Sequence, residues 1–153
     1  MTKYQLRQEA ASFRDAIVRA KRDRAFGRRD RMNEFPRGCC DDIADLFTHY
    51  LYHKYGVDSI RVDGDYYDGN FDNNCSHSWQ EVGKSIVDIT GDQFKYDPVF
   101  LNYDKSVYVG PMDDFHSLFD IKRAEYSCGI ENLNIDSWDR MYELYNTILS
   151  YME

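Results

Sequence analysis

Residues 76–90 read Ser-His-Ser-Trp-Gln-Glu-Val-Gly-Lys-Ser-Ile-Val-Asp-Ile-Thr. Two short runs that contain β-branched and aromatic residues flank the dipeptide Gly83-Lys84, a composition typical of a β-hairpin with a tight turn. The sequence therefore predicts two antiparallel strands, at residues 76–82 and 85–90.

The register of this hairpin determines whether His77 and Asp88 lie on the same face of the sheet. A turn at Gly83-Lys84 makes His77 a diagonal neighbour of Asp88, and a turn at Val82-Gly83 places the two residues directly opposite each other. Both registers put the two side chains on one face, with their Cβ atoms about 5–8 Å apart. A slip by one residue would separate them.

Helices are expected on both sides of the hairpin. Apolar residues recur every three or four positions over residues 2–31, 40–55 and 136–151, the spacing of amphipathic helices. Gly56 directly follows the second of these segments and suits the left-handed cap that ends many helices.

The remaining segments predict a small sheet. Short strands are expected at 59–63 and 106–109, with a polar loop at 63–74 between the first strand and the hairpin. Helices that come first and strands that follow indicate one α+β domain over residues 1–153, with a mostly antiparallel sheet.

The composition is that of a folded domain, because 42% of the residues are hydrophobic and 16% are aromatic. No apolar run is long enough to span a membrane. The first 31 residues are too polar for a secretory signal, so we expect a cytoplasmic protein whose four cysteines are thiols.

Charge is distributed unevenly along the chain. Residues 1–31 contain ten Lys and Arg residues against four Asp and Glu residues, whereas residues 32–153 contain nine against 23. An acidic body repels phosphates, so nucleic acid is an unfavourable partner. The basic segment is either a solvated helix face or a docking site for an acidic protein partner.

Cys40 occupies a position suited to a reactive thiol. It follows the loop at 35–39 and opens the second expected helix. A thiolate is the reactive form of cysteine, and the unpaired N–H groups at a helix start favour an anion.

Cys40, His77 and Asp88 together have the chemistry of a catalytic triad. Cys40 would be the nucleophile, and His77 would remove its proton and later return a proton to the leaving group. Asp88 would hold the imidazole in one tautomer and stabilise its charged form.

This order of residues resembles the papain-like superfamily of thiol enzymes, and within it the transglutaminase-like branch, which includes transglutaminases, arylamine N-acetyltransferases and bacterial deamidases and peptidases. The segments that carry the resemblance are Gly38-Cys39-Cys40-Asp41, His77-Ser78-Trp79 and Val87-Asp88-Ile89-Thr90-Gly91-Asp92-Gln93-Phe94. The resemblance implies a fold in which the nucleophile starts a helix that packs on a small antiparallel sheet carrying His and Asp. It divides the chain into a basic N-terminal helix (1–35), a catalytic helix and sheet (36–110) and a C-terminal loop and helix (111–153).

Three further residues are candidates for the site. Cys39 competes with Cys40 for the role of nucleophile, but adjacent residues at a helix start point about 100° apart, so only one of them can face His77. We favour Cys40 and expect Cys39 to pack or to form part of the pocket wall. Trp79 and Gln93 are expected to line the site. The backbone N–H of Cys40 is one candidate oxyanion donor, and the second donor is not identified.

These residues predict a cysteine-dependent hydrolase of amide bonds, a peptidase or a glutamine deamidase, that works through a thioester on a peptide or protein substrate without a cofactor. A transferase with an amine acceptor would use the same triad, as in a transglutaminase or N-acyltransferase. A non-catalytic interaction domain on the same fold is the alternative from another class.

Two groups of residues contain metal-ligand types, but their spacing does not favour a metal site. Cys39, Cys40, Cys75 and His77 include soft zinc ligands, but their spacing is not the usual Cys-x₂₋₄-Cys. The acidic loop at 63–74 lacks the glycine and the final glutamate of a calcium-binding loop at the required positions.

His49 and His53 are four residues apart on the second expected helix, which is the spacing of two metal ligands on one helix face. No third ligand is evident nearby in the sequence, so they are interpreted as surface or helix-end residues. His116 likewise has no matched partner.

Overall fold

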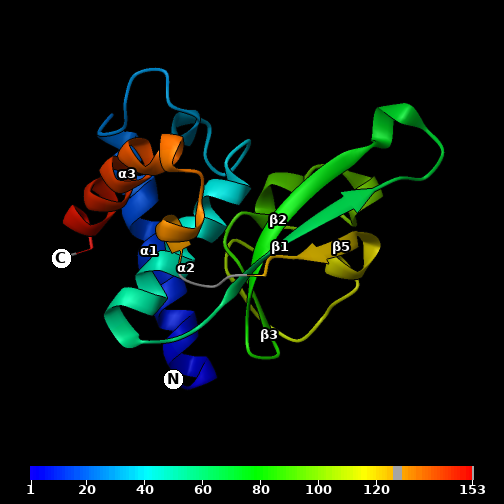
Figure 1. The fold of residues 1–153 in the computed structure, drawn as a ribbon. Coiled ribbons are helices and arrows are strands. Elements are labelled where there is room, and N and C mark those ends of the chain that lie inside the picture. Colours follow the sequence, from blue (N-terminus) through cyan, green and yellow to red (C-terminus); the bar gives the residue numbers. More distant parts are fainter. Residues whose placement is uncertain (126–128, 153) are drawn as a thin grey trace.

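The computed structural model describes residues 1–125 and 129–152 and confirms an α+β fold. Within these residues, three α-helices gather on one side of the molecule and a five-stranded antiparallel sheet extends from them (Figure 1). The helices are α1 (Lys3–Arg22), α2 (Cys40–Tyr55) and α3 (Trp138–Ser150). The strands are β1 (Ile60–Tyr66), β2 (Cys75–Val82), β3 (Ser85–Asp88), β4 (Tyr108–Gly110) and β5 (Asp120–Arg123).

Helix α2 has the bounds that its apolar spacing predicts. It starts at Cys40, and Gly56 ends it with a positive φ of 65° in the left-handed region. Helix α3 starts two residues later than expected, because a 3₁₀ turn at Ile135–Ser137 precedes it.

Helix α1 is shorter than predicted and ends at Arg22 instead of continuing to about residue 31. Arg24 adopts a left-handed φ of 58°, and the side chain of Phe26 turns back into the core. Asp30 then caps a separate 3₁₀ turn at Arg31–Glu34 by accepting the N–H of Met32. Burial of one aromatic ring and a local cap therefore override a helical pattern whose last turns have little apolar surface to bury.

The sheet has the strand order β4-β3-β2-β1-β5, and every neighbouring pair is antiparallel. The predicted hairpin is confirmed as β2 and β3, with Val82 opposite Ser85 and the turn at Gly83-Lys84. Strands β1 and β2 form a second, longer hairpin that projects from the sheet (Figure 1).

Two features of the β1 edge were not predicted. Strand β1 continues through Gly64 to Tyr66 instead of ending in a loop at residue 63, and β5 pairs with its outer edge. A Cβ atom at Gly64 would lie 2.6 Å from Cβ of Phe119 and 3.1 Å from the Trp79 ring, so this glycine permits close packing within a strand.

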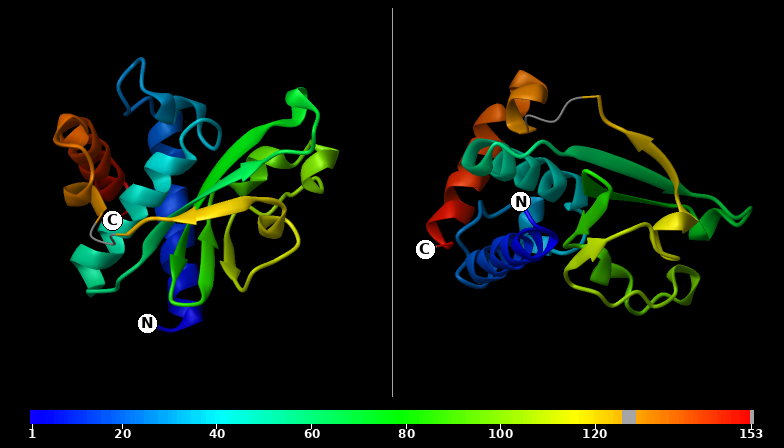
Figure 2. Two further views of the ribbon diagram at one scale, coloured as in Figure 1. Left: turned by 45° about the vertical axis from the view of Figure 1, so that its right-hand side comes forward. Right: turned by 90° about the horizontal axis from the view of Figure 1, so that it is seen from below.

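The central part of the sheet, strands β2 to β4, is mostly buried on both faces. On one face, Val87, Ile89 and Val109 join the core formed by the helices. On the other face, Trp79 and Ile86 contact aromatic residues from the segments before and after β4. Figure 2 shows those segments on the side of the sheet away from the helices. A mostly aromatic second core thus covers the face that carries the candidate site.

No helix in the described part of the chain combines the length and the apolar character that crossing a membrane requires.

Candidate active site

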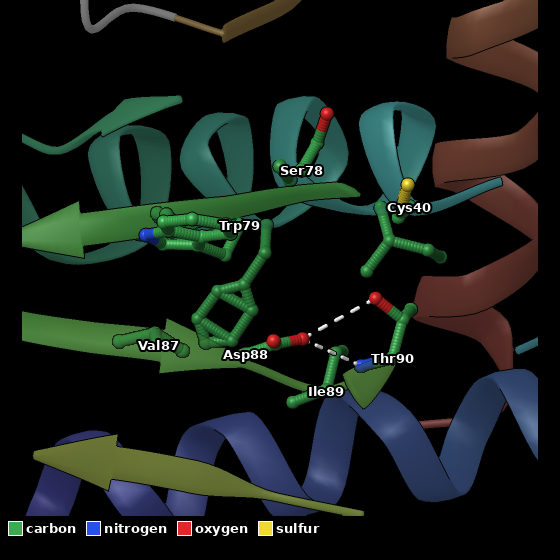
Figure 3. Close-up of a pocket in the computed structure, with 11 residues that line it drawn as sticks. Cys40, Ser78, Trp79, Val87, Asp88, Ile89 and Thr90 are labelled. Carbon is green, nitrogen blue, oxygen red and sulfur yellow. Dashed lines mark hydrogen bonds between the residues drawn. The ribbon is translucent and has the colours of Figure 1, made fainter. Parts of the chain in front are cut away.

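Cys40 is the first residue of α2, and Cys39 is its N-cap residue. The first N–H groups of an α-helix have no acceptor inside the helix, and the helix dipole adds a partial positive charge there. Helix α2 begins beside the edge of the sheet where β2 starts and β3 ends (Figure 3). Cys40 therefore lies where a helix start and the two site-bearing strands meet.

His77 and Asp88 form the buried pair that the hairpin register predicts. Nε2 of His77 lies 2.7 Å from Oδ2 of Asp88, and both side chains are almost completely inaccessible to solvent. The observed register makes them diagonal neighbours on one face of the sheet.

Cys40 lies close enough to His77 to contribute to the raised pKa of the imidazole. Because Asp88 occupies Nε2, the nitrogen left for the thiol is Nδ1. Burial lowers the pKa of His77, but the charge and hydrogen bond of Asp88 and the contact with Cys40 outweigh burial and raise this pKa to about 9. The imidazole is thereby strengthened as a base toward Cys40.

Cys39 points elsewhere. Its side chain is completely buried in the core formed by the helices. Burial and the nearby carboxylate of Asp42 raise the pKa of the Cys39 thiol to about 12. The expectation that Cys39 packs is confirmed, and a buried thiol in this environment is a poor nucleophile.

Sequence reasoning missed His116, which joins the other side of Asp88. Its Nε2 lies 2.8 Å from the same Oδ2 that contacts His77, and its Nδ1 lies 2.7 Å from Oδ1 of Asp113. His116 is completely buried and contacts two carboxylates, so the interpretation that it has no partner is wrong. Asp113 and His116 are three positions apart in the sequence, and this local Asp-His spacing was the available signal for the contact between them.

The carboxylate of Asp88 is held at both oxygens. Oδ1 accepts the backbone N–H of Thr90 at 3.0 Å and its hydroxyl at 3.3 Å. Burial raises the pKa of Asp88, but His77 and His116 outweigh burial and hold it well below its usual value. A Cβ atom at Gly91 would lie 3.1 Å from Oδ2 and 2.6 Å from the Tyr103 ring, so the backbone approaches the carboxylate closely there.

Gln93 and Trp79 both contact His77. Nε2 of Gln93 is 3.3 Å from Nδ1 of His77 and donates to the carbonyl oxygen of Thr90 at 3.0 Å. The Trp79 ring packs against the rings of His77 and His116, and Figure 3 shows its indole nitrogen on the side away from Cys40. Gln93 therefore offers a donor near the reactive edge of His77, and Trp79 forms a wall.

Two hollows adjoin the site. The first is a cavity of about 10 Å³ between α2 and the hairpin, lined by residues that include Cys40, Trp79 and Thr90 (Figure 3). That volume is near the lower limit for one water molecule. The second is an open surface hollow of about 410 Å³ lined by Arg37, Gln93, Phe94, Tyr96 and Asp97. Only the second has the size of a ligand site.

Arg14 of α1 fixes the chain just after β3. Its guanidinium forms two contacts with the carboxylate of Asp92, at 3.0 and 2.8 Å, and donates to the carbonyl oxygen of Ile89 at 2.6 Å. It also lies over the Phe35 ring, in the segment that leads to Cys40. One side chain therefore contacts the segments that carry both halves of the candidate site.

A second ion-pair cluster fixes the start of α2. Asp42 accepts hydrogen bonds from Arg31 at 2.6 and 2.8 Å and from Arg140 of α3 at 2.9 and 3.2 Å. Arg140 also binds Asp30 at 2.8 and 3.0 Å. These bonds link the residues that flank the nucleophile loop to the C-terminal helix.

Neither metal site weighed from the sequence is present as a ligand cluster. In residues 1–125 and 129–152, Cys39, Cys40, Cys75 and His77 do not bring their ligand atoms together, and neither do the acidic residues of 63–74.

His49 and His53 do lie beside a third ligand type, the carboxylate of Glu131. His49 is buried and His53 is exposed, so the surface interpretation is wrong for His49. Glu131 could not be matched to them from the sequence because about 80 residues separate them.

Comparison with family models, curated proteins and solved structures gives no match for this chain.

Proposed function

We propose that the protein is a cysteine-dependent enzyme that attacks the carbonyl carbon of an amide. The observation that supports this function is the placement of Cys40, the first residue of α2, beside the buried His77–Asp88 pair. This arrangement is similar to that of papain-like and transglutaminase-like enzymes, as the sequence resemblance implies.

The first half of the proposed reaction forms a thioester in two steps. Nδ1 of His77 takes the proton of the Cys40 thiol, and the sulfur forms a bond to the substrate carbonyl carbon. The same nitrogen then protonates the leaving amine as the C–N bond breaks, which leaves a thioester. Asp88 holds the imidazole and stabilises its positive charge throughout.

The negative oxygen of the tetrahedral intermediate needs two donors. The backbone N–H of Cys40 supplies one, because it belongs to the first turn of α2 and has no acceptor inside the helix. We assign the second to Nε2 of Gln93, which lies 3.3 Å from His77.

Substrate approach is assigned to the open hollow beside Gln93. Its volume of about 410 Å³ and its shallow walls, which include exposed Tyr96, suit a peptide or protein segment that presents one side chain or one bond. Water as the acceptor gives a hydrolase, a peptidase or a deamidase. An amine acceptor gives a transferase through the same thioester.

The interaction-domain alternative has less support. Arg14 and Arg31 form ion pairs within the fold, so part of the basic segment is used internally. Docking of an acidic partner would depend on the exposed cations Arg24, Arg28 and Arg29.

The pH dependence of iodoacetamide labelling, mapped by peptide mass spectrometry, tests the proposal. We expect fast labelling of Cys40 below pH 7, because an imidazolium partner and the helix start favour the thiolate. His77→Ala should slow the labelling at least about tenfold at that pH, and amide substrates should trap a thioester on Cys40 only when His77 is present.

Cys39 is the internal control, since its buried thiol should label slowly at every pH short of unfolding. Labelling of Cys40 that rises only near the ordinary thiol pKa of about 8.5, with no effect of His77→Ala, would refute the triad.

A further inference from the structure

A second cluster of titratable side chains lies away from the triad, where α2 meets the 3₁₀ turn at Gly129–Asn132. Nδ1 of His49 is 3.1 Å from Oε2 of Glu131, and Nε2 of His53 is 3.0 Å from Oε1 of the same carboxylate. The two imidazole rings lie 4.1 Å apart on one face of α2. Two imidazoles and a carboxylate thus converge from two segments distant in the sequence.

Close packing fixes Glu131 in this place. Gly129 has a φ of 85°, and a Cβ atom there would lie 2.5 Å from Cα of His49, so only glycine lets the turn approach α2 this closely. The next residue, Ile130, is completely buried. On the other side, the His49 ring packs against the rings of Tyr142 and Tyr145 of α3. The carboxylate therefore belongs to a rigid turn.

The ligand atoms have the spacing of a metal site. Nitrogen and oxygen ligands bound to zinc at 2.0–2.1 Å with tetrahedral angles lie about 3.3 Å apart. The two nitrogen–oxygen distances at Glu131 are 3.0 and 3.1 Å, and one ligand atom from each residue lies within 4.8 Å of the others. A cation placed between these three groups therefore requires little movement of the ligand atoms.

We propose that His49, His53 and Glu131 bind a divalent transition-metal ion, with zinc as the best match to two imidazoles and one carboxylate. His53 and Glu131 are exposed, so a fourth position is open to water. The ion would link the second half of α2, the helix that carries Cys40, to the turn at Gly129–Asn132.

One contact must give way when the ion binds. The backbone N–H of Ile130 points at Nδ1 of His49 at 3.3 Å, a long hydrogen bond that competes for the same lone pair. Zinc binding should therefore change the environment of the Ile130 amide. This effect gives a readout that does not depend on enzyme activity.

The test is equilibrium dialysis of chelator-treated full-length protein against zinc ions alone, with an ¹⁵N–¹H spectrum of the same samples. We expect one zinc ion per chain, a shift of the Ile130 amide resonance and a higher Tm with zinc. His53→Ala and Glu131→Gln should each weaken binding at least about tenfold. Both positions are partly exposed, so these variants should fold.

Matched variants separate this site from the other places where zinc could bind. Glu143→Gln changes an exposed carboxylate of α3 outside the cluster, and Cys40→Ala and His116→Gln change the triad region. All three should retain wild-type binding. No binding by the wild-type chain would overturn the proposal, as would binding that survives His53→Ala and Glu131→Gln but is lost in Cys40→Ala. The first result would leave the proposed thiol chemistry untouched, whereas the second would make Cys40 a zinc ligand and count against its role as nucleophile.

Discussion

Asp88 is the residue on which the two buried imidazoles converge. His77 and His116 both contact Oδ2, while Thr90 donates to Oδ1. A carboxylate with this many donors cannot rotate freely, and its charge is fixed beside His77. The orientation and the basicity of His77 therefore both depend on Asp88.

Replacement of this charge by an amide should disable the site. In Asp88→Asn, the loss of the anion should lower the pKa of His77 and favour the wrong tautomer, and amide turnover should fall about 10²–10⁴-fold. The measurement is turnover together with the alkylation rate of Cys40 against pH. Asp104→Asn, an exposed residue, is the control. Equal turnover in Asp88→Asn and the control would exclude a role for Asp88.

His116 shares Asp88 with His77, so its charge should be visible in the titration of His77. Burial lowers the pKa of His116, but Asp113 and Asp88 outweigh burial and raise it. His116→Gln keeps a donor for Asp88 and removes a cation, so the pKa of His77 should rise further. NMR titration of the His77 ring against pH checks this direction. An unchanged His77 titration would show that His116 does not act through Asp88.

At the scale of elements, two ion-pair groups hold α2 and the end of β3 in register. Arg14 contacts Asp92 and Ile89 after β3, and the Asp42 cluster fixes the start of α2. The helix and the hairpin carry different members of the triad, so their relative position decides whether Cys40 meets His77. These salt bridges are therefore positioning contacts.

Removal of Arg14 tests this link. Arg14→Ala leaves the half-buried carboxylate of Asp92 without its partner, so the free energy of unfolding should fall by about 2–4 kcal/mol. Urea unfolding measures the loss. Arg22→Ala is the matched control on the same helix, because its pair with Asp23 is 3.5 Å long and exposed and should contribute less than about 0.5 kcal/mol. Similar losses in the two variants would contradict the positioning role.

The elements that local sequence determines were predictable. The hairpin turn at Gly83-Lys84 and the start of α2 at Cys40 follow from turn chemistry and apolar period, and they suffice to place His77 beside Asp88. The end of α1 and strand β5 were not predictable, because Phe26 and Asp120–Arg123 take their conformations from distant packing partners.

The same distinction applies to the site. His77 and Asp88 belong to one hairpin, so their contact follows from register. His116 reaches Asp88, and Glu131 reaches His49, through long connections, and no period or turn signal specifies such contacts.

At the scale of the whole molecule, burial of the central strands on both faces of the sheet explains why many ionisable groups have shifted pKa values. The aromatic core on one face and the helical core on the other enclose His77, Asp88 and His116, so each ionised group there needs a partner. The folded state consequently contains many ionisable side chains with shifted pKa values, and its stability must depend on pH.

The loss of stability at acidic pH comes from carboxylates whose pKa values are lowered on folding. The buried or partly buried aspartates among them are Asp30, Asp42, Asp63, Asp88 and Asp113; burial raises the pKa of each, but hydrogen bonds and cationic partners outweigh it. Their contribution to stability is present above the usual Asp pKa of 3.8 and is lost as the pH falls through the lower folded values. Asp45 opposes this trend, because burial raises its pKa to about 6.

The loss of stability at alkaline pH comes from His77 and His116, whose pKa values are raised on folding. Their contribution is complete below the usual His pKa of 6.5 and is lost as the pH rises, for His77 through about 9. The free energy of unfolding should therefore be greatest between pH 4 and 6.5. It should decline on both sides, which urea unfolding at pH 3, 5, 7 and 9.5 will measure.

Asp42→Asn tests whether protonation of Asp42 contributes to the loss of stability at acidic pH. The variant should lose about 2–4 kcal/mol at pH 5, because Arg31 loses its carboxylate partner and Arg140 keeps only Asp30. The further loss between pH 5 and pH 3 should be smaller than in the wild-type chain, since one of the protonating groups is gone. Asp104→Asn, on the surface, should keep the wild-type slope. Parallel pH curves for Asp42→Asn and the wild type would mean that the ion pairs at the start of α2 do not control acid stability.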